Sequence, residues 1–161
     1  MIETIQWDEG RAQVVRNGEV RTYLMSQGLP AETLLFEADS VGAEPFVTAS
    51  GQHLISIGAF DDDFQFFIDI NTGSVFFGLD ADENPAHSNA SLTFFVACIL
   101  LVQESYPFYN FNDTTEVKRE AGQVLADSIR KIDPMCLDFS DGFWPSFVHD
   151  VSIGDYYEGS L

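Results

Sequence analysis

The sequence predicts an α+β fold in which a central, mainly antiparallel sheet is backed by helices. Three observations support this prediction. Short apolar runs separated by turn residues occupy the middle of the chain, longer helical patterns follow them, and the length of 161 residues suits a single domain spanning residues 1–161. A hydrophobic content of 45% and an aromatic content of 14% are enough for a substantial core.

The sheet is predicted from three runs of strand length that are rich in β-branched and aromatic residues, at 54–60, 64–70 and 75–79. Asp61-Asp62-Asp63 separates the first two runs, and Asn71-Thr72-Gly73-Ser74 separates the last two. A spacer that contains Asn and Gly is typical of a tight hairpin, so we expect an antiparallel meander. An earlier run, Thr33 to Glu37, also predicts a strand.

Residue alternation predicts which sides of the middle strand face the core. Phe64, Phe66 and Ile68 fall on one face. Phe67 falls on the opposite face between polar neighbours. An aromatic residue at that position predicts that something covers part of the second face as well.

Helical patterns flank the meander. Capping residues, apolar spacing and helix-ending Gly or Pro residues predict helices at 19–27, from Leu92 to about Tyr106, from about 116 to 132, and a short one around 143–148. Asn89 and Ser91 are both candidate caps for the second of these helices. That helix is apolar almost all round, which predicts a buried position behind the sheet.

Charge is the most unusual feature of the composition. Seven Lys and Arg residues against 26 Asp and Glu residues give a net charge of −19. All seven basic residues lie in two segments, 11–21 and 118–131. Such a chain repels nucleic acid and anionic membranes and attracts basic proteins or cations. We therefore expect a basic protein partner, with no nucleic acid or membrane partner.

The N-terminal segment MIETIQWDEG has neither the basic region nor the apolar region of a signal peptide, and the longest apolar run is too short to span a bilayer. These features predict a cytoplasmic protein whose two cysteines, Cys98 and Cys136, are free thiols.

Motifs that carry chemistry are absent. The segment Asp80-Ala81-Asp82-Glu83-Asn84 resembles the start of a calcium loop, but Pro85 and Ser91 stand where the turn Gly and the bidentate Glu are needed. The three histidines have no partner at a metal-ligand spacing. We expect no enzyme, no catalytic residue, no metal site and no cofactor. Two alternatives stay open: a metal-dependent hydrolase that uses clustered carboxylates, and a regulatory protein-binding adaptor.

Several short motifs occur in a characteristic order. They are Gly28-Leu29-Pro30, Leu54-Ile55-Ser56-Ile57-Gly58, Ile68-Asp69-Ile70-Asn71-Thr72-Gly73-Ser74-Val75, Asn89-Ala90-Ser91-Leu92, Ile132-Asp133-Pro134 and Phe143-Trp144. Between about Val20 and Val151 the chain thereby resembles the SUKH superfamily, most closely its fourth family. The resemblance implies an α+β fold and a bacterial immunity role, in which the protein binds and neutralises a cognate toxin domain inside the producing cell.

The acidity and the resemblance together predict the contact residues. A toxin that acts on nucleic acid must present Lys and Arg to phosphates, and an acidic protein can occupy that surface. The candidate partner-binding residues are the acids of two sheet-end loops and two C-terminal tyrosines: Asp61, Asp62, Asp63, Asp80, Asp82, Glu83, Tyr156 and Tyr157. Phe108, Tyr109 and Phe111 are further candidate aromatic anchors, although core packing explains them equally well. Plain solvation is the alternative role for each acid.

Overall fold

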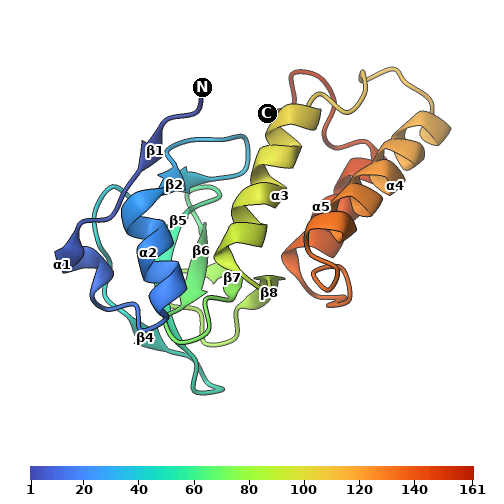
Figure 1. The fold of residues 1–161 in the computed structure, drawn as a ribbon. Coiled ribbons are helices and arrows are strands. Elements are labelled where there is room, and N and C mark those ends of the chain that lie inside the picture. Colours follow the sequence, from blue (N-terminus) through green and yellow to red (C-terminus); the bar gives the residue numbers. More distant parts are fainter.

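A six-stranded antiparallel sheet lies at the centre of the computed structural model, which describes all residues from Met1 to Leu161 (Figure 1). The strand order is β3-β5-β6-β7-β8, and β4 pairs with the same strand, β5, as β3 does. The strands are β3 (Glu37–Ala38), β4 (Phe46–Val47), β5 (His53–Ala59), β6 (Phe64–Asp69), β7 (Val75–Leu79) and β8 (Ala86–Asn89). A separate two-stranded sheet is formed by β1 (Thr4–Ile5) and β2 (Leu29–Pro30).

The α+β fold and the β5–β6–β7 meander are confirmed. The predicted strand at Thr33–Glu37 is wrong over most of its length, because only Glu37 at its end pairs with β5. Leu35 and Phe36 instead enter the core from an irregular segment. The sequence prediction missed β8, whose residues Ala-His-Ser-Asn show no strand composition.

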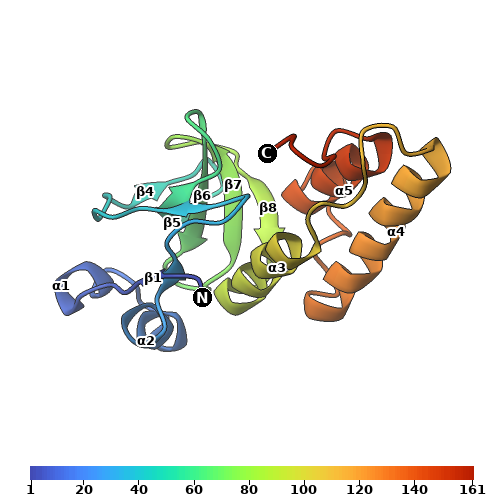
Figure 2. The same cartoon turned by 90° about the horizontal axis from the view of Figure 1, so that it is seen from above.

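Five helices complete the fold: α1 (Glu9–Ala12), α2 (Gly18–Ser26), α3 (Leu92–Ser105), α4 (Thr115–Ile132) and α5 (Phe143–Ile153). Figure 2 shows α2 and α3 on the same side of the sheet, while α4 and α5 lie side by side beyond β8. Each of the first four helices begins at a polar cap; for α3 the cap is Ser91, whose Oγ accepts from the backbone N–H of Phe94 at 3.2 Å. None of the helices combines the length and the apolar composition required to cross a bilayer.

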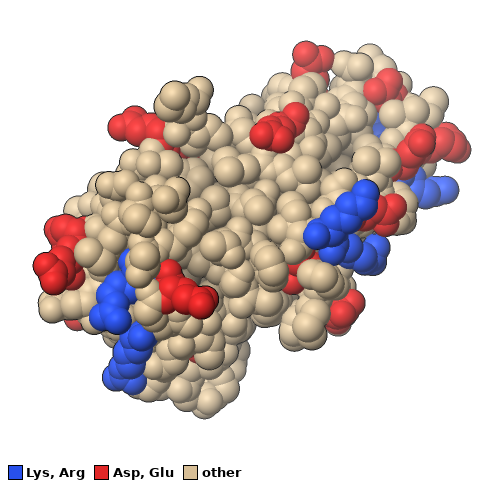
Figure 3. Space-filling model, viewed as in Figure 1, with Lys and Arg blue, Asp and Glu red and all other residues tan.

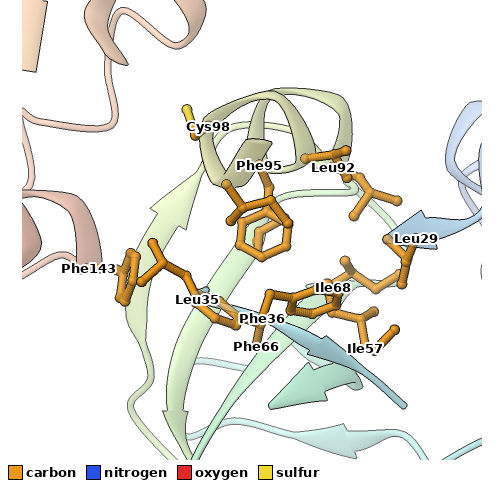
Figure 4. Close-up of a cluster of buried hydrophobic side chains, with 14 of the residues drawn as sticks. Leu29, Leu35, Phe36, Ile57, Phe66, Ile68, Leu92, Phe95, Cys98 and Phe143 are labelled. Atoms are coloured by element: carbon orange, nitrogen blue, oxygen red, sulfur yellow. The ribbon is translucent and has the colours of Figure 1, made fainter. Parts of the chain in front are cut away.

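One core of 29 buried residues joins the sheet to the helices. In Figure 4, Leu92 and Phe95 point from α3 toward Phe66 and Ile68 of β6. The ring of Phe66 lies 4.7 Å from that of Phe95 and 5.0 Å from that of Phe143, measured between centroids. These contacts link β6, α3 and α5, so the three elements depend on one aromatic cluster.

The predicted all-round burial of α3 is wrong on one side. Phe94 is 37% exposed and Thr93 is exposed, whereas the adjacent Phe95 is completely buried. The helix packs on the sheet along one side and on α4 along another, which leaves a strip open to solvent.

The second face of the sheet is covered, as we predicted from the aromatic residue Phe67. Phe67 and Leu54 are fully buried there, and the ring of Phe46 in β4 lies 5.2 Å from that of Phe67 in an edge-to-face contact. The loop that contains β4 therefore forms a thin lid over this face.

Two glycines of the family-like motifs hold positions that no other residue fits. Gly28 has a φ of 74°, and a Cβ added to it would lie 2.5 Å from the carbonyl oxygen of Ile5. A Cβ on Gly58 would lie 2.3 Å from the ring of Phe36. The two glycines thus allow the backbone to lie close to neighbouring elements of the fold.

Three other motifs meet in one buried hydrogen-bond network. Oδ2 of Asp133 accepts from Nδ2 of Asn89 at 3.0 Å and from the backbone N–H of Ala90 at 2.9 Å. Oδ1 of Asn89 accepts from Nε1 of Trp144 at 2.8 Å and from the hydroxyl of Ser88 at 3.0 Å. The network ties β8 and the start of α3 to the end of α4 and to α5.

His87 of β8 makes folding depend on pH. Burial lowers the pKa of His87, and the charge of Asp133 opposes this shift only in part. The unfolded chain therefore binds a proton more readily than the folded protein. The contribution of His87 to the free energy of unfolding is fully present above the ordinary pKa of about 6.5, and it is lost as the pH falls through the lower pKa of the folded state.

We expect a His87→Phe variant, which can keep the stack on Phe139 seen at 4.0 Å, to lose this part of the pH dependence. The measurement is urea unfolding at several pH values between about 7 and 5, around the ordinary histidine pKa. The same substitution at the exposed His149 is the matched control. An identical slope in wild type and His87→Phe would contradict the prediction.

Candidate partner-binding surface

The two predicted acidic loops lie at the same end of the sheet, where β5 turns into β6 and β7 turns into β8 (Figure 2). Antiparallel pairing places the first residue of β6, Phe64, opposite the last residue of β7, Leu79. The structure therefore brings together Asp61-Asp62-Asp63 and the segment 80–83, as the meander required.

Two acids in these loops shape the backbone. Oδ1 of Asp61 accepts from the backbone N–H groups of Asp63 at 2.9 Å and Phe64 at 2.8 Å. Asp82 accepts from the backbone N–H groups of Asn84 at 2.8 Å and Leu79 at 3.3 Å. Such turns are local; Asp61 needs only one acceptor oxygen for them, whereas Asp82 uses both of its oxygens.

The remaining loop acids have no such role. Asp62, Asp63, Asp80 and Glu83 are exposed, and their side chains make no hydrogen bond within the chain. Asp80 faces the β4 side of the sheet, where it lines a small hollow with Phe46 and Phe67. Solvent and any partner can therefore reach all four carboxylates.

A cleft of about 430 Å³ opens between this end of the sheet and α5. Aromatic side chains from the sheet, α5 and the C-terminal segment line its floor: Phe60, Phe64, Phe77, Phe143, Phe147 and Tyr156. Phe64 stacks on Phe77 at 5.2 Å between centroids, yet 37% of Phe64 stays exposed. The volume is in the range of sites that hold small molecules or inserted side chains.

The cleft has an acidic rim. Asp61 and Asp82 come from the two loops, Asp141 precedes α5, and Asp150 lies in the last turns of α5. No Lys or Arg is among the lining residues. The cleft therefore combines an apolar floor with uncompensated negative charge.

Asp150 is placed at an electrostatic cost. It lies near the C-terminus of α5, where the helix dipole is negative, and no basic residue occupies the last turn. Burial, and next the charge of Asp155, raise the pKa of Asp150. Burial and the charges of Asp150 and Asp155 also raise the pKa of Tyr156 to about 12. Burial is the first cause of both shifts, and the neighbouring carboxylates add to it.

The family model described as SUKH-4 immunity protein matches residues 7–150, which include the sheet, the buried network and α4. The chain belongs to the SUKH-4 immunity protein family. No curated protein and no solved structure gives a significant match. Family membership indicates a toxin-immunity role, which implies that the protein binds a cognate toxin.

The two predicted tyrosines of this SUKH-4 protein take different positions. Tyr156 lines the cleft and packs on Phe147 at 4.7 Å between centroids. Tyr157 packs on Phe111, at 5.0 Å, and does not line the cleft. The structure therefore groups only Tyr156 with the acidic loops.

Among the other aromatic candidates, Tyr109 is buried. Its hydroxyl donates to the carbonyl oxygen of Val151 and accepts from the backbone N–H of Tyr156 at 3.2 Å. Tyr109 thus positions the C-terminal segment that carries Tyr156. Phe108 is half-buried, while Phe111 is 64% exposed.

The acidity of the SUKH-4 protein is not neutralised internally. The structure contains one ion pair, between Arg130 and Asp127 at 3.5 Å. On the face drawn in Figure 3, basic side chains gather around α1 and the start of α2 and again over α4. Nearly all of the 26 acidic residues therefore contribute to a negative electrostatic potential around the protein.

Sequence reasoning missed Asp141, Asp150 and the aromatic floor. No local pattern singles out these residues, because they meet the acidic loops only once α5 packs against β8. No three His, Cys, Asp or Glu side chains form a group suited to a metal ion.

Proposed function

We propose that this SUKH-4 protein neutralises a nucleic-acid-targeting toxin domain in the cytoplasm of the producing cell by covering the toxin's basic surface. The observation that carries the proposal is the net charge of −19 in a fold with a single ion pair. A toxin that contacts phosphates presents Lys and Arg, so the same surface attracts an acidic protein. Occlusion of that surface stops the toxin without any chemistry by the inhibitor.

The two acidic loops at the end of the sheet are suited to electrostatic steering of an approaching partner protein. Asp62, Asp63 and Glu83 are exposed and free of internal partners, so their charges act on an approaching protein over roughly 8–10 Å at physiological salt. Apolar contacts at the centre of the interface then hold the complex, since exposed charge pairs contribute little to affinity.

The test is the rate of association with the toxin domain encoded beside this gene, measured at several salt concentrations together with inhibition of that toxin. We expect tight inhibition and an association rate that falls by roughly tenfold or more as salt rises. Replacing Asp61, Asp62 and Asp63 together by Asn should slow association and flatten its salt dependence. Asn keeps the acceptor oxygen that Asp61 needs for its turn, so the fold should persist.

Replacing Asp80, Asp82 and Glu83 by their amides tests the second loop, where Asn at position 82 keeps one of the two oxygens that accept from the backbone N–H groups of Leu79 and Asn84. The matched control is Glu116→Gln, Glu120→Gln and Asp127→Asn on exposed positions of α4, which changes the net charge equally. A toxin domain that neither binds nor is inhibited would overturn the proposed function. An association rate that changes neither with salt nor with the substitutions in the two loops would show that the acidity serves solubility.

A further inference from the structure

We propose that the aromatic cleft between the sheet and α5 receives an arginine side chain of the toxin domain. This inference rests on the proposed function and extends it by naming the anchor point and its chemistry. The cleft offers what a guanidinium needs: the partly exposed aromatic side chain of Phe64, and the carboxylates of Asp61, Asp82, Asp141 and Asp150 among the lining residues.

The composition of the cleft selects a cation with a flat, weakly hydrated head. An apolar molecule would fit the floor but would leave the four carboxylates without a positively charged partner, and an anion would be repelled by them. A lysine ammonium is more strongly hydrated and cannot stack, whereas a guanidinium stacks on aromatic rings and donates to carboxylates with both edges.

The placement of Asp150 supports this assignment. A half-buried carboxylate near the C-terminus of a helix, with Asp155 nearby and no basic neighbour in the last turn, destabilises the free protein. An incoming positive charge relieves this repulsion. A guanidinium that lies against these rings also gains a cation–π contact, which is stronger where water is excluded than at an exposed site.

The chain itself contains a smaller example of the same arrangement. The guanidinium carbon of Arg11 lies 4.1 Å from the centre of the Trp7 ring, and Arg11 Nη1 donates to the carbonyl oxygen of Asp39 at 2.9 Å. Asp8 and Asp39 are the nearby acids. An aromatic ring flanked by acidic residues is thus an environment in which this fold already holds an arginine.

The first arm of the test uses the full chain and the toxin domain encoded beside this gene. Phe64→Ala and, separately, Asp150→Asn should each raise the dissociation rate at least tenfold while the association rate changes much less. Phe94→Ala is the matched control, because Phe94 is also 37% exposed but lies on α3 outside the cleft. Glu120→Gln is the control for the charge change, because Glu120 is exposed and lies outside the cleft.

If the toxin domain binds and both cleft variants dissociate at the wild-type rate, the arginine anchor is wrong while the proposed function stands. If the toxin domain does not bind the wild-type chain, the proposed function fails, and a second arm decides the inference. That arm titrates N-acetyl-arginine amide into the protein and follows the resonances of Phe64, Asp150 and Tyr156 by NMR.

In this second arm we expect saturable shifts with the arginine compound. The uncharged isostere N-acetyl-citrulline amide should give none, and Asp150→Asn should weaken the response several-fold. Equal shifts with citrulline, or no shift with arginine, would overturn the proposal. Equal binding of N-acetyl-lysine amide would overturn the choice of a guanidinium.

Discussion

Phe95→Ala is expected to destabilise the protein by about 3–5 kcal/mol, the usual cost of removing a fully buried aromatic side chain. Phe95 is 0% exposed, and its ring contacts those of Phe66, at 4.7 Å, and Phe36, at 5.4 Å. The cavity would open in the cluster that joins α3 to the sheet, where no neighbour can fill it without leaving its own contacts.

The neighbouring residue supplies the control. Phe94→Ala removes the same atoms from the next position of α3, but Phe94 is 37% exposed, so the loss should be about 1 kcal/mol or less. Urea unfolding of both variants gives the two free energies under identical conditions. Similar losses for Phe94 and Phe95 would mean that α3 is oriented differently from the structure described above.

Asp133→Ala is expected to cost roughly 2–5 kcal/mol, because it leaves one buried and one partly buried donor without a partner at about 1–3 kcal/mol each. Those donors are Nδ2 of Asn89 and the backbone N–H of Ala90. Asp133→Asn should lose less, since an amide oxygen in place of Oδ2 can still accept both bonds and only the bond from the backbone N–H of Met135 to Oδ1 is lost.

Asp138→Ala is the matched control, because Asp138 lies in the same connector between α4 and α5 but is exposed. Thermal or urea unfolding compares the three variants, and the near-UV signal of Trp144 reports on the network itself. An Asp133→Ala variant as stable as Asp138→Ala would show that the network contributes nothing to the fold.

These two predictions concern the scaffold on which the cleft depends. Asn89 and Trp144 connect β8 to α5, and α5 supplies both Asp150 and the ring of Phe143. Loosening the network would therefore be expected to disturb the partner surface, although no residue of the network lines the cleft.

The residues that carry the family resemblance maintain the fold. Gly58 admits the ring of Phe36, while Asn89, Asp133 and Trp144 form the buried network. The acidic and aromatic cleft uses other positions, such as Asp61, Phe64 and Asp150. The family motifs thus account for the scaffold, and the charge of the partner surface is a property of this chain.

Local patterns in the sequence were sufficient for the meander and the main helices. Alternation in β6 identified both covered faces, since Phe66 and Phe67 are each fully buried on opposite sides. Capping residues identified the starts of α3 and α4. These features depend on neighbours in the chain, and their physical causes act over a few residues. The acidic loops were also predictable as neighbours, because adjacent antiparallel strands bring alternate turns to one end of a sheet.

Only the tertiary structure decided which of those acids share a site. Asp61 and Asp82 meet Asp141 and Asp150 because α5 packs beside β8, where the side chains of Trp144 and Asn89, 55 positions apart in the chain, form a hydrogen bond. The same packing brings Tyr156 into the cleft and leaves Tyr157 outside it. Short-range sequence patterns do not predict such contacts, because the contacts arise from the balance of burial and hydrogen bonding over the whole core.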